Sequence, residues 1–162
     1  MLGGLGRSPV RLSRVAASEL TTLVERMRPV LLRYPQIAAA WVFGSAAREE
    51  LRPESDIDVG LLLHDSRATA ADEYAMLGDL VARLEVVTAP RPVDVVLLEH
   101  QGPVFAHEAL IDGVLILERD RERRADFEAS AVMRGIDFRP TWEIARQGQL
   151  EGLRERLRGA RR

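Results

Sequence analysis

The chain has 162 residues, of which 46% are hydrophobic and 30% charged, a balance typical of one compact domain with an apolar core. Because cysteine is absent, disulfide bonds, thiolate metal sites and cysteine nucleophiles are excluded, and we expect a cytoplasmic location. The net charge of −2 gives no basic surface of the kind that binds nucleic acid tightly, and no apolar run is long enough to span a membrane.

The first half of the chain alternates between helix and strand patterns. Residues 1–14 mix glycine and arginine without periodicity, and we expect a flexible lead-in there. From Ser18 to Leu31, apolar residues recur with the one-sided spacing of an amphipathic helix. Two short apolar runs, 37–43 and 57–63, then have the length and composition of buried strands.

The second half continues the alternation and ends in helices. It predicts a helix over 68–84, a strand over 93–98, a helix over 103–112, a strand over 114–117, a helix over 121–134 that ends at Gly135, and a last helix over 141–158. Within the first of these helices, Tyr74 falls on the face that we expect to pack inward.

This order of elements predicts the fold class and the domain organisation. Strands that alternate with helices indicate a single α/β (α+β) layered fold. We expect the main domain over 15–118 and a C-terminal helical extension over 119–162 packed on it. The extension is the basic part of the chain, with 12 Arg against 8 acidic residues. The alternating signs at its start favour a solvated helix with paired charges over a surface that binds an acidic partner or a phosphate.

Gly44 and Ser45 directly follow the first predicted strand. Glycine lets the backbone turn sharply, and the serine with the amides after it offers donors to phosphate oxygens. Alone, this dipeptide more often marks a turn or a helix cap. Arg48 lies one helical turn further on and offers a guanidinium to a phosphate, although a surface ion pair with Glu49 or Glu54 is an equal alternative.

Three aspartates open two of the apolar strands. Asp56 and Asp58 are two residues apart, so their side chains point to the same face of the strand. Such a pair either stands solvated at a strand mouth or binds a cation, and hard oxygen ligands suit magnesium. Asp94 lies at the start of the third strand. If this strand is the neighbour of the second in the sheet, Asp94 lies beside Asp56 and Asp58. Three acids of this kind can frame two cations for in-line displacement at a triphosphate.

Gly-Ser, ten intervening residues, Asp-x-Asp and a later strand aspartate together resemble the polymerase-β-like nucleotidyltransferase superfamily. The small size, the Asp-Phe-Arg-Pro stretch at 137–140 and the closing helix are similar to the minimal nucleotidyltransferase group within it, over about residues 20–158. The resemblance implies a mixed sheet of about four strands flanked by helices.

The resemblance also implies roles for the residues of the motif. Asp56 and Asp58 would ligate two magnesium ions. Asp94 would ligate the catalytic ion and help to deprotonate the acceptor. Gly44 and Ser45 would hold the triphosphate.

Members of the minimal group that this chain resembles most act as antitoxins of all-helical HEPN ribonuclease toxins. The resemblance then implies ATP as the donor, AMP transfer to a tyrosine hydroxyl of the toxin, and a hetero-oligomer of the two proteins. Two alternatives stay open. One is transfer to a small hydroxylated molecule such as an aminoglycoside, for which the short C-terminal part offers little material. The other is a non-catalytic antitoxin that acts by binding, against which the intact Gly-Ser and aspartates argue.

Overall fold

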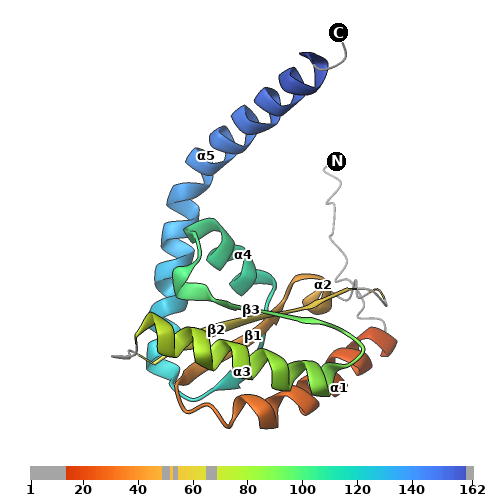
Figure 1. Cartoon of the computed structure of the whole chain (residues 1–162). Coiled ribbons are helices and arrows are strands. Elements are labelled where there is room, and N and C mark those ends of the chain that lie inside the picture. The colour runs from red at the N-terminus through yellow and green to blue at the C-terminus, as the bar shows by residue number, and fades with distance from the viewer. Residues whose placement is uncertain (1–13, 49–51, 53–54, 65–68, 160–162) are drawn as a thin grey trace, which may run out of the picture.

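The computed structural model describes residues 14–48, 52, 55–64 and 69–159 of the chain (Figure 1). Its elements follow in the order α1 (Arg14–Leu31), β1 (Ile37–Phe43), α2 (Gly44–Ala47), β2 (Ile57–Leu63), α3 (Ala70–Thr88), β3 (Val93–Leu97), the 3-10 turn η1 (Leu98–His100), α4 (Pro103–Asp112), β4 (Val114–Glu118) and α5 (Arg121–Gly159). None of the helices in these ranges has the length and apolar content needed to cross a bilayer.

The four strands form one mixed sheet in the order β3-β2-β1-β4. Strand β1 is antiparallel to both of its neighbours, β2 and β4. Strands β2 and β3 are parallel, because α3 carries the chain back to the same end of the sheet. The predicted α/β fold with a mixed four-stranded sheet is therefore confirmed.

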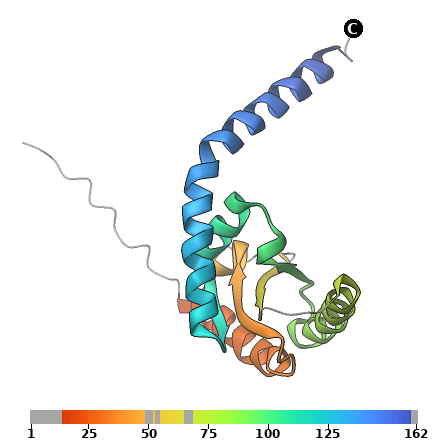
Figure 2. The ribbon, with the colours of Figure 1, turned by 90° about the vertical axis from the view of Figure 1, so that its left-hand side faces the viewer.

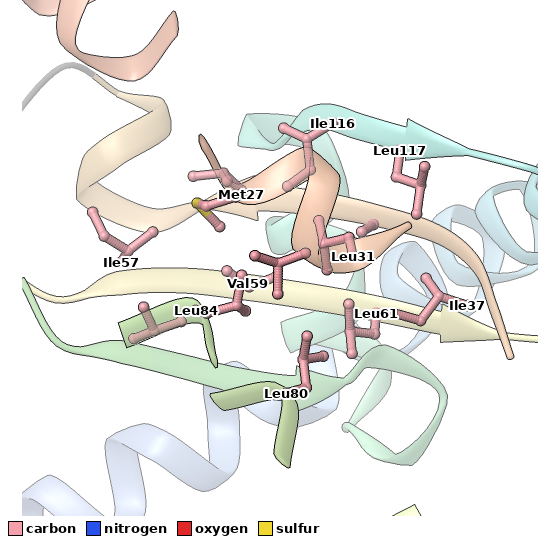
Figure 3. Packing of buried hydrophobic residues seen from close by; sticks show 14 of the residues in the cluster. Met27, Leu31, Ile37, Ile57, Val59, Leu61, Leu80, Leu84, Ile116 and Leu117 are labelled. Carbon is pink, nitrogen blue, oxygen red and sulfur yellow. The ribbon is translucent and has the colours of Figure 1, made fainter. Parts of the chain in front are cut away.

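One face of the sheet is covered by α1 and α3, and most of the core lies there. Figure 3 shows this packing, with side chains of both helices directed at alternate residues of β2. Ile57, Val59 and Leu61 of β2 are at most 1% exposed and belong to this cluster. From the helices, the cluster includes Met27 of α1 and Leu80 of α3.

The opposite face of the sheet is covered by α4 and the first half of α5 (Figure 2). Trp41 of β1 and Leu62 of β2 pack there against small residues of both helices, among them Ala109 and Ala131. Figures 1 and 2 agree that the second half of α5 projects away from the rest of the molecule.

Helix α5 corrects the expectation of two separate helices over 121–134 and 141–158. It runs from Arg121 to Gly159 without a break, so the predicted end at Gly135 is wrong. Gly135 is buried, and a Cβ at its position would lie 2.4 Å from the Cβ of His107 on α4. The glycine thus allows α4 and α5 to cross at close distance and does not end a helix. Pro140 is also inside α5, where its missing N–H is the expected cause of the bend in the helix seen in Figure 2.

Tyr74 is a further correction, because it is 80% exposed on α3 and does not face the core. The expected lead-in over 1–14 lies almost wholly outside the described residues, and α1 begins at Arg14. The expected division of the chain near residue 118 stays a prediction.

We predict that Gly135→Ala destabilises the protein by about 1–3 kcal/mol, because the added methyl group overpacks the contact with His107. Gly78→Ala in α3 is the matched control. Apart from the backbone of α3 itself, no described residue has an atom within 4 Å of a Cβ at that position, so this variant should gain about 0.5–1 kcal/mol from helix propensity alone. Chemical denaturation of both variants measures the difference, and equal stability of the two would contradict the close crossing.

Candidate active site

The packing of β2 determines where its aspartate points. Because Ile57 and Val59 are buried against α1 and α3, the residue between them, Asp58, faces the α4 side of the sheet. In the parallel pairing of β2 with β3, Asp58 lies directly opposite Asp94. Neighbouring strands are about 4.8 Å apart, so the two carboxylates are side by side. Asp56, two residues earlier, is exposed at the entrance to β2.

The three aspartates affect one another electrostatically. Asp58 is half-buried, and its pKa is raised first by this burial and then by the negative charges of Asp94 and Asp56. The positive charge of Arg48 lowers the pKa of Asp58 and only partly offsets these effects. A cation between the carboxylates would remove the repulsion, which is the general reason that such groups gather around metals.

The donor set fits magnesium, which takes one or two carboxylates and fills its other positions with water and substrate phosphates. It is not a complete protein cage. Among the residues that the structure describes, no three carboxylate or imidazole groups are gathered tightly enough to enclose an ion by themselves. A magnesium ion bound by these carboxylates would therefore take its remaining ligands from water and from substrate phosphates.

Gly44 forms the turn between β1 and α2 and lies against Asp58. Its φ of +67° is in the left-handed region that side chains disfavour. A Cβ at this position would also lie 2.1 Å from Oδ2 of Asp58. Only glycine therefore permits both the turn and the position of the carboxylate. Ser45 follows in the single turn of α2 and is half-buried.

Arg48 closes α2, and its backbone N–H donates to the Gly44 carbonyl at 3.2 Å. Its Nη1 lies 3.6 Å from Oδ2 of Asp112 on α4, with both side chains nearly half exposed. The alternative partners Glu49 and Glu54 lie outside the described residues. The guanidinium is thus at the surface beside Gly44, where it can exchange one anion for another.

Sequence reasoning missed Arg91, which supports the segment before Asp56. Its side chain is only 12% exposed. One of its terminal nitrogens donates to the backbone carbonyls of Arg52 and, at 3.4 Å, of Ser55, while the other binds Glu19 of α1 at 2.7 Å. The position between Pro90 and Pro92 was the only sequence signal, because its partners lie far away in the chain.

A cavity of about 370 Å³ opens beside Gly44, between α2, α4 and α5, and was also missed. Phe43, Phe105 and Ala109 form apolar parts of its wall, and Arg48 and Arg139 contribute positive charge. Its lining residues come from four separate elements, so no local sequence pattern predicts the cavity.

We predict that Asp58→Asn raises the melting temperature of the metal-free protein at neutral pH. The folded-state pKa of Asp58 is raised, so the carboxyl group favours folding most when protonated in acid, and this stability is lost as pH rises through the raised pKa. Asparagine removes that loss while keeping the shape of the side chain. Thermal unfolding in EDTA between pH 4 and pH 8 should show a gap between variant and wild type that widens with pH.

Magnesium provides the second part of the same test. Added Mg²⁺ should raise the melting temperature of the wild type and leave that of Asp58→Asn almost unchanged. Equal stabilisation of both proteins by Mg²⁺ would contradict a cation site at Asp58.

Comparisons with known proteins identify the family of the chain. The family model "Polymerase beta, Nucleotidyltransferase" matches residues 25–122, which include β1, β2, β3 and all three aspartates. No curated protein matches the sequence at a significant level.

Solved structures show the same fold. One chain of a crystal structure of a toxin–antitoxin pair with AMP-PNP is 18% identical, with a TM-score of 0.58 over 80% of this chain and 97% of that chain. A second is from a complex of the tri-AMPylated Shewanella oneidensis HEPN toxin with its MNT antitoxin, 16% identical, with a TM-score of 0.50 over 85% of this chain and 98% of that chain. Because the family model matches residues 25–122, more than half of the chain, the chain belongs to the polymerase beta nucleotidyltransferase family.

Proposed function

We propose that the chain is a magnesium-dependent nucleotidyltransferase that transfers AMP from ATP to a tyrosine hydroxyl of a HEPN ribonuclease toxin, and that it acts in the cytoplasm as the antitoxin. The observation that carries the enzymatic part is the alignment of Asp58 with Asp94 on the face of the sheet where Gly44 makes its turn. The similar toxin–antitoxin structures, one with AMP-PNP and one with an AMPylated HEPN toxin, support the donor and the acceptor.

The proposed site has a place for each part of the donor. Gly44 makes the turn that brings the start of α2 beside Asp58, and the Ser45 hydroxyl with the amides after it would donate to the phosphate oxygens. Arg48 adds a guanidinium on the same side. Asp56, Asp58 and Asp94 would hold two magnesium ions. When bound, this magnesium supplies positive charge that neutralises the triphosphate and the departing pyrophosphate.

The reaction is an in-line displacement at phosphorus. The acceptor oxygen forms a bond to the α-phosphorus of ATP as the bond from that phosphorus to the bridging oxygen of the β-phosphate breaks, and pyrophosphate leaves. The proton of the acceptor hydroxyl passes to the carboxylate of Asp94, which is exposed and can pass it to water. Because β3 is an edge strand of the sheet, Asp94 is accessible to a large acceptor such as a protein.

The proposed function is tested by incubating the purified chain with Mg²⁺ and α-labelled ATP, with and without a co-expressed helical partner. We predict label on the partner with the wild type, and a loss of at least about a thousandfold in rate with Asp56→Ala/Asp58→Ala, because several kcal/mol of charge stabilisation disappear. Asp126→Ala, which removes an exposed aspartate of α5, is the control and should transfer normally.

The same variants separate the alternatives. A double variant that transfers no label but still neutralises the partner would replace the proposal with a non-catalytic antitoxin. Label on an added aminoglycoside, with none on any protein, would replace the acceptor but keep the transfer chemistry. No transfer to either acceptor by the wild type would contradict the enzymatic proposal.

We further predict that Arg91→Gln lowers kcat about tenfold, because the segment before Asp56 loses the guanidinium that binds its backbone carbonyls. Arg91→Lys keeps the charge without the planar fork and should fall between the variant and the wild type. Arg83→Gln, which removes an exposed pair with Asp79 on α3, is the matched control.

Rates should be measured well below the melting temperature, so that unfolding does not contribute. A loss of kcat at nearly constant KM supports a positioning role for Arg91. A variant that is less stable but has the wild-type kcat would reduce Arg91 to a structural residue.

A further inference from the structure

The cavity beside Gly44 has an apolar wall and several charged side chains at its edge. Its apolar wall includes Phe43 of β1 and Phe105 of α4, whose rings meet edge to face with centroids 5.7 Å apart. Around this wall stand two arginines and two acids, which are Arg48, Arg139, Glu108 and Asp112. The volume of about 370 Å³ is within the range of small-molecule sites.

The two arginines reach the cavity from different elements. Arg48 ends α2, and Arg139 comes from α5, 91 positions later in the chain. Each is held by a carboxylate of α4, since Arg48 pairs with Asp112 at 3.6 Å and Arg139 pairs with Glu108 at 3.4 Å. All four side chains are about half exposed, and ion pairs of this kind contribute little to stability.

The Glu108–Arg139 pair is not needed to hold α4 against α5. The helices already pack through buried Ala109 and Ala131 and through the close crossing of Gly135 and His107. Among the described residues, the ion-pair partner of Arg139 is the exposed Glu108, which a stronger anion in the cavity can replace. A triphosphate is such an anion, and guanidinium forks match its oxygens.

We propose that Arg139 is a second arginine for the phosphates of the donor nucleotide, facing Arg48 across the cavity, and that bound nucleotide takes the place of Glu108. The inference rests on the proposed function, because it adds a residue to the same donor site. It gives the Asp-Phe-Arg-Pro stretch of α5 a chemical role and makes the C-terminal helix part of the nucleotide site.

Two substitutions test the proposal because their effects should have opposite signs. Arg139→Gln removes a positive charge and should weaken nucleotide binding about fivefold to tenfold. Glu108→Gln removes the negative charge that competes with the phosphates and should strengthen binding about twofold to threefold. If the pair were only a tie between two helices, both variants would break it equally and change nucleotide affinity in the same direction or not at all.

The measurement is calorimetric titration of the full chain with Mg²⁺ and α,β-methylene ATP, whose α–β linkage cannot be cleaved. Arg134→Gln removes an exposed arginine of α5 whose Nε donates to the Ser130 carbonyl of the same helix at 3.4 Å; this variant is the matched control and should bind like the wild type. Raising the salt concentration should weaken binding less steeply in Arg139→Gln than in the wild type, because one charge contact is missing.

The outcomes distinguish this inference from the function on which it rests. If the wild type binds the nucleotide and Arg139→Gln binds it equally well, Arg139 is not a phosphate ligand and the donor site remains with Gly44 and Arg48. If both Arg139→Gln and Glu108→Gln weaken binding, the pair is structural and the inference is overturned. If the wild type binds no nucleotide, the proposed function fails and this inference fails with it.

Discussion

The parallel pairing of β2 with β3 is the constraint on which the rest of the site depends. It places Asp58 opposite Asp94, and the burial of Ile57 and Val59 turns both carboxylates away from the main core. A shift of β3 by one residue against β2 would move Asp94 to the other face of the sheet, away from Asp58 and toward the side covered by α1 and α3. Thus the apolar packing of one face determines the chemistry of the other.

The close approach of Gly44 to Asp58 is possible only as long as residue 44 has no side chain. On the other side, the carboxylates repel one another, as the raised pKa of Asp58 reflects. The protein therefore keeps unfavourable charge in one place, and the sheet with its two layers of helices holds it there. This is the usual relation between a rigid scaffold and a strained functional site.

Much of the fold could be predicted from the sequence, because its signals are local. The apolar runs 37–43 and 57–63 coincide with β1 and β2, and the Gly-Ser and Asp-x-Asp spacing indicated the family. Gly135 was misread because a glycine at a helix end and a glycine at a helix crossing look the same in sequence. What differs is His107, which reaches the glycine only in the folded chain. Arg91 and the cavity beside Gly44 were missed for the same reason, since their partners come from distant elements.

The central claim is that the aspartates of β2 and β3 bind divalent cations for a nucleotide held at Gly44. The most direct measurement is a crystal structure with Mn²⁺ in place of Mg²⁺ and with α,β-methylene ATP, using anomalous scattering to locate the metal. We expect an anomalous peak ligated by Asp58 together with Asp56 or Asp94, and triphosphate oxygens between that peak and Gly44. A nucleotide bound elsewhere, or manganese that avoids these carboxylates when the nucleotide is bound, would contradict it.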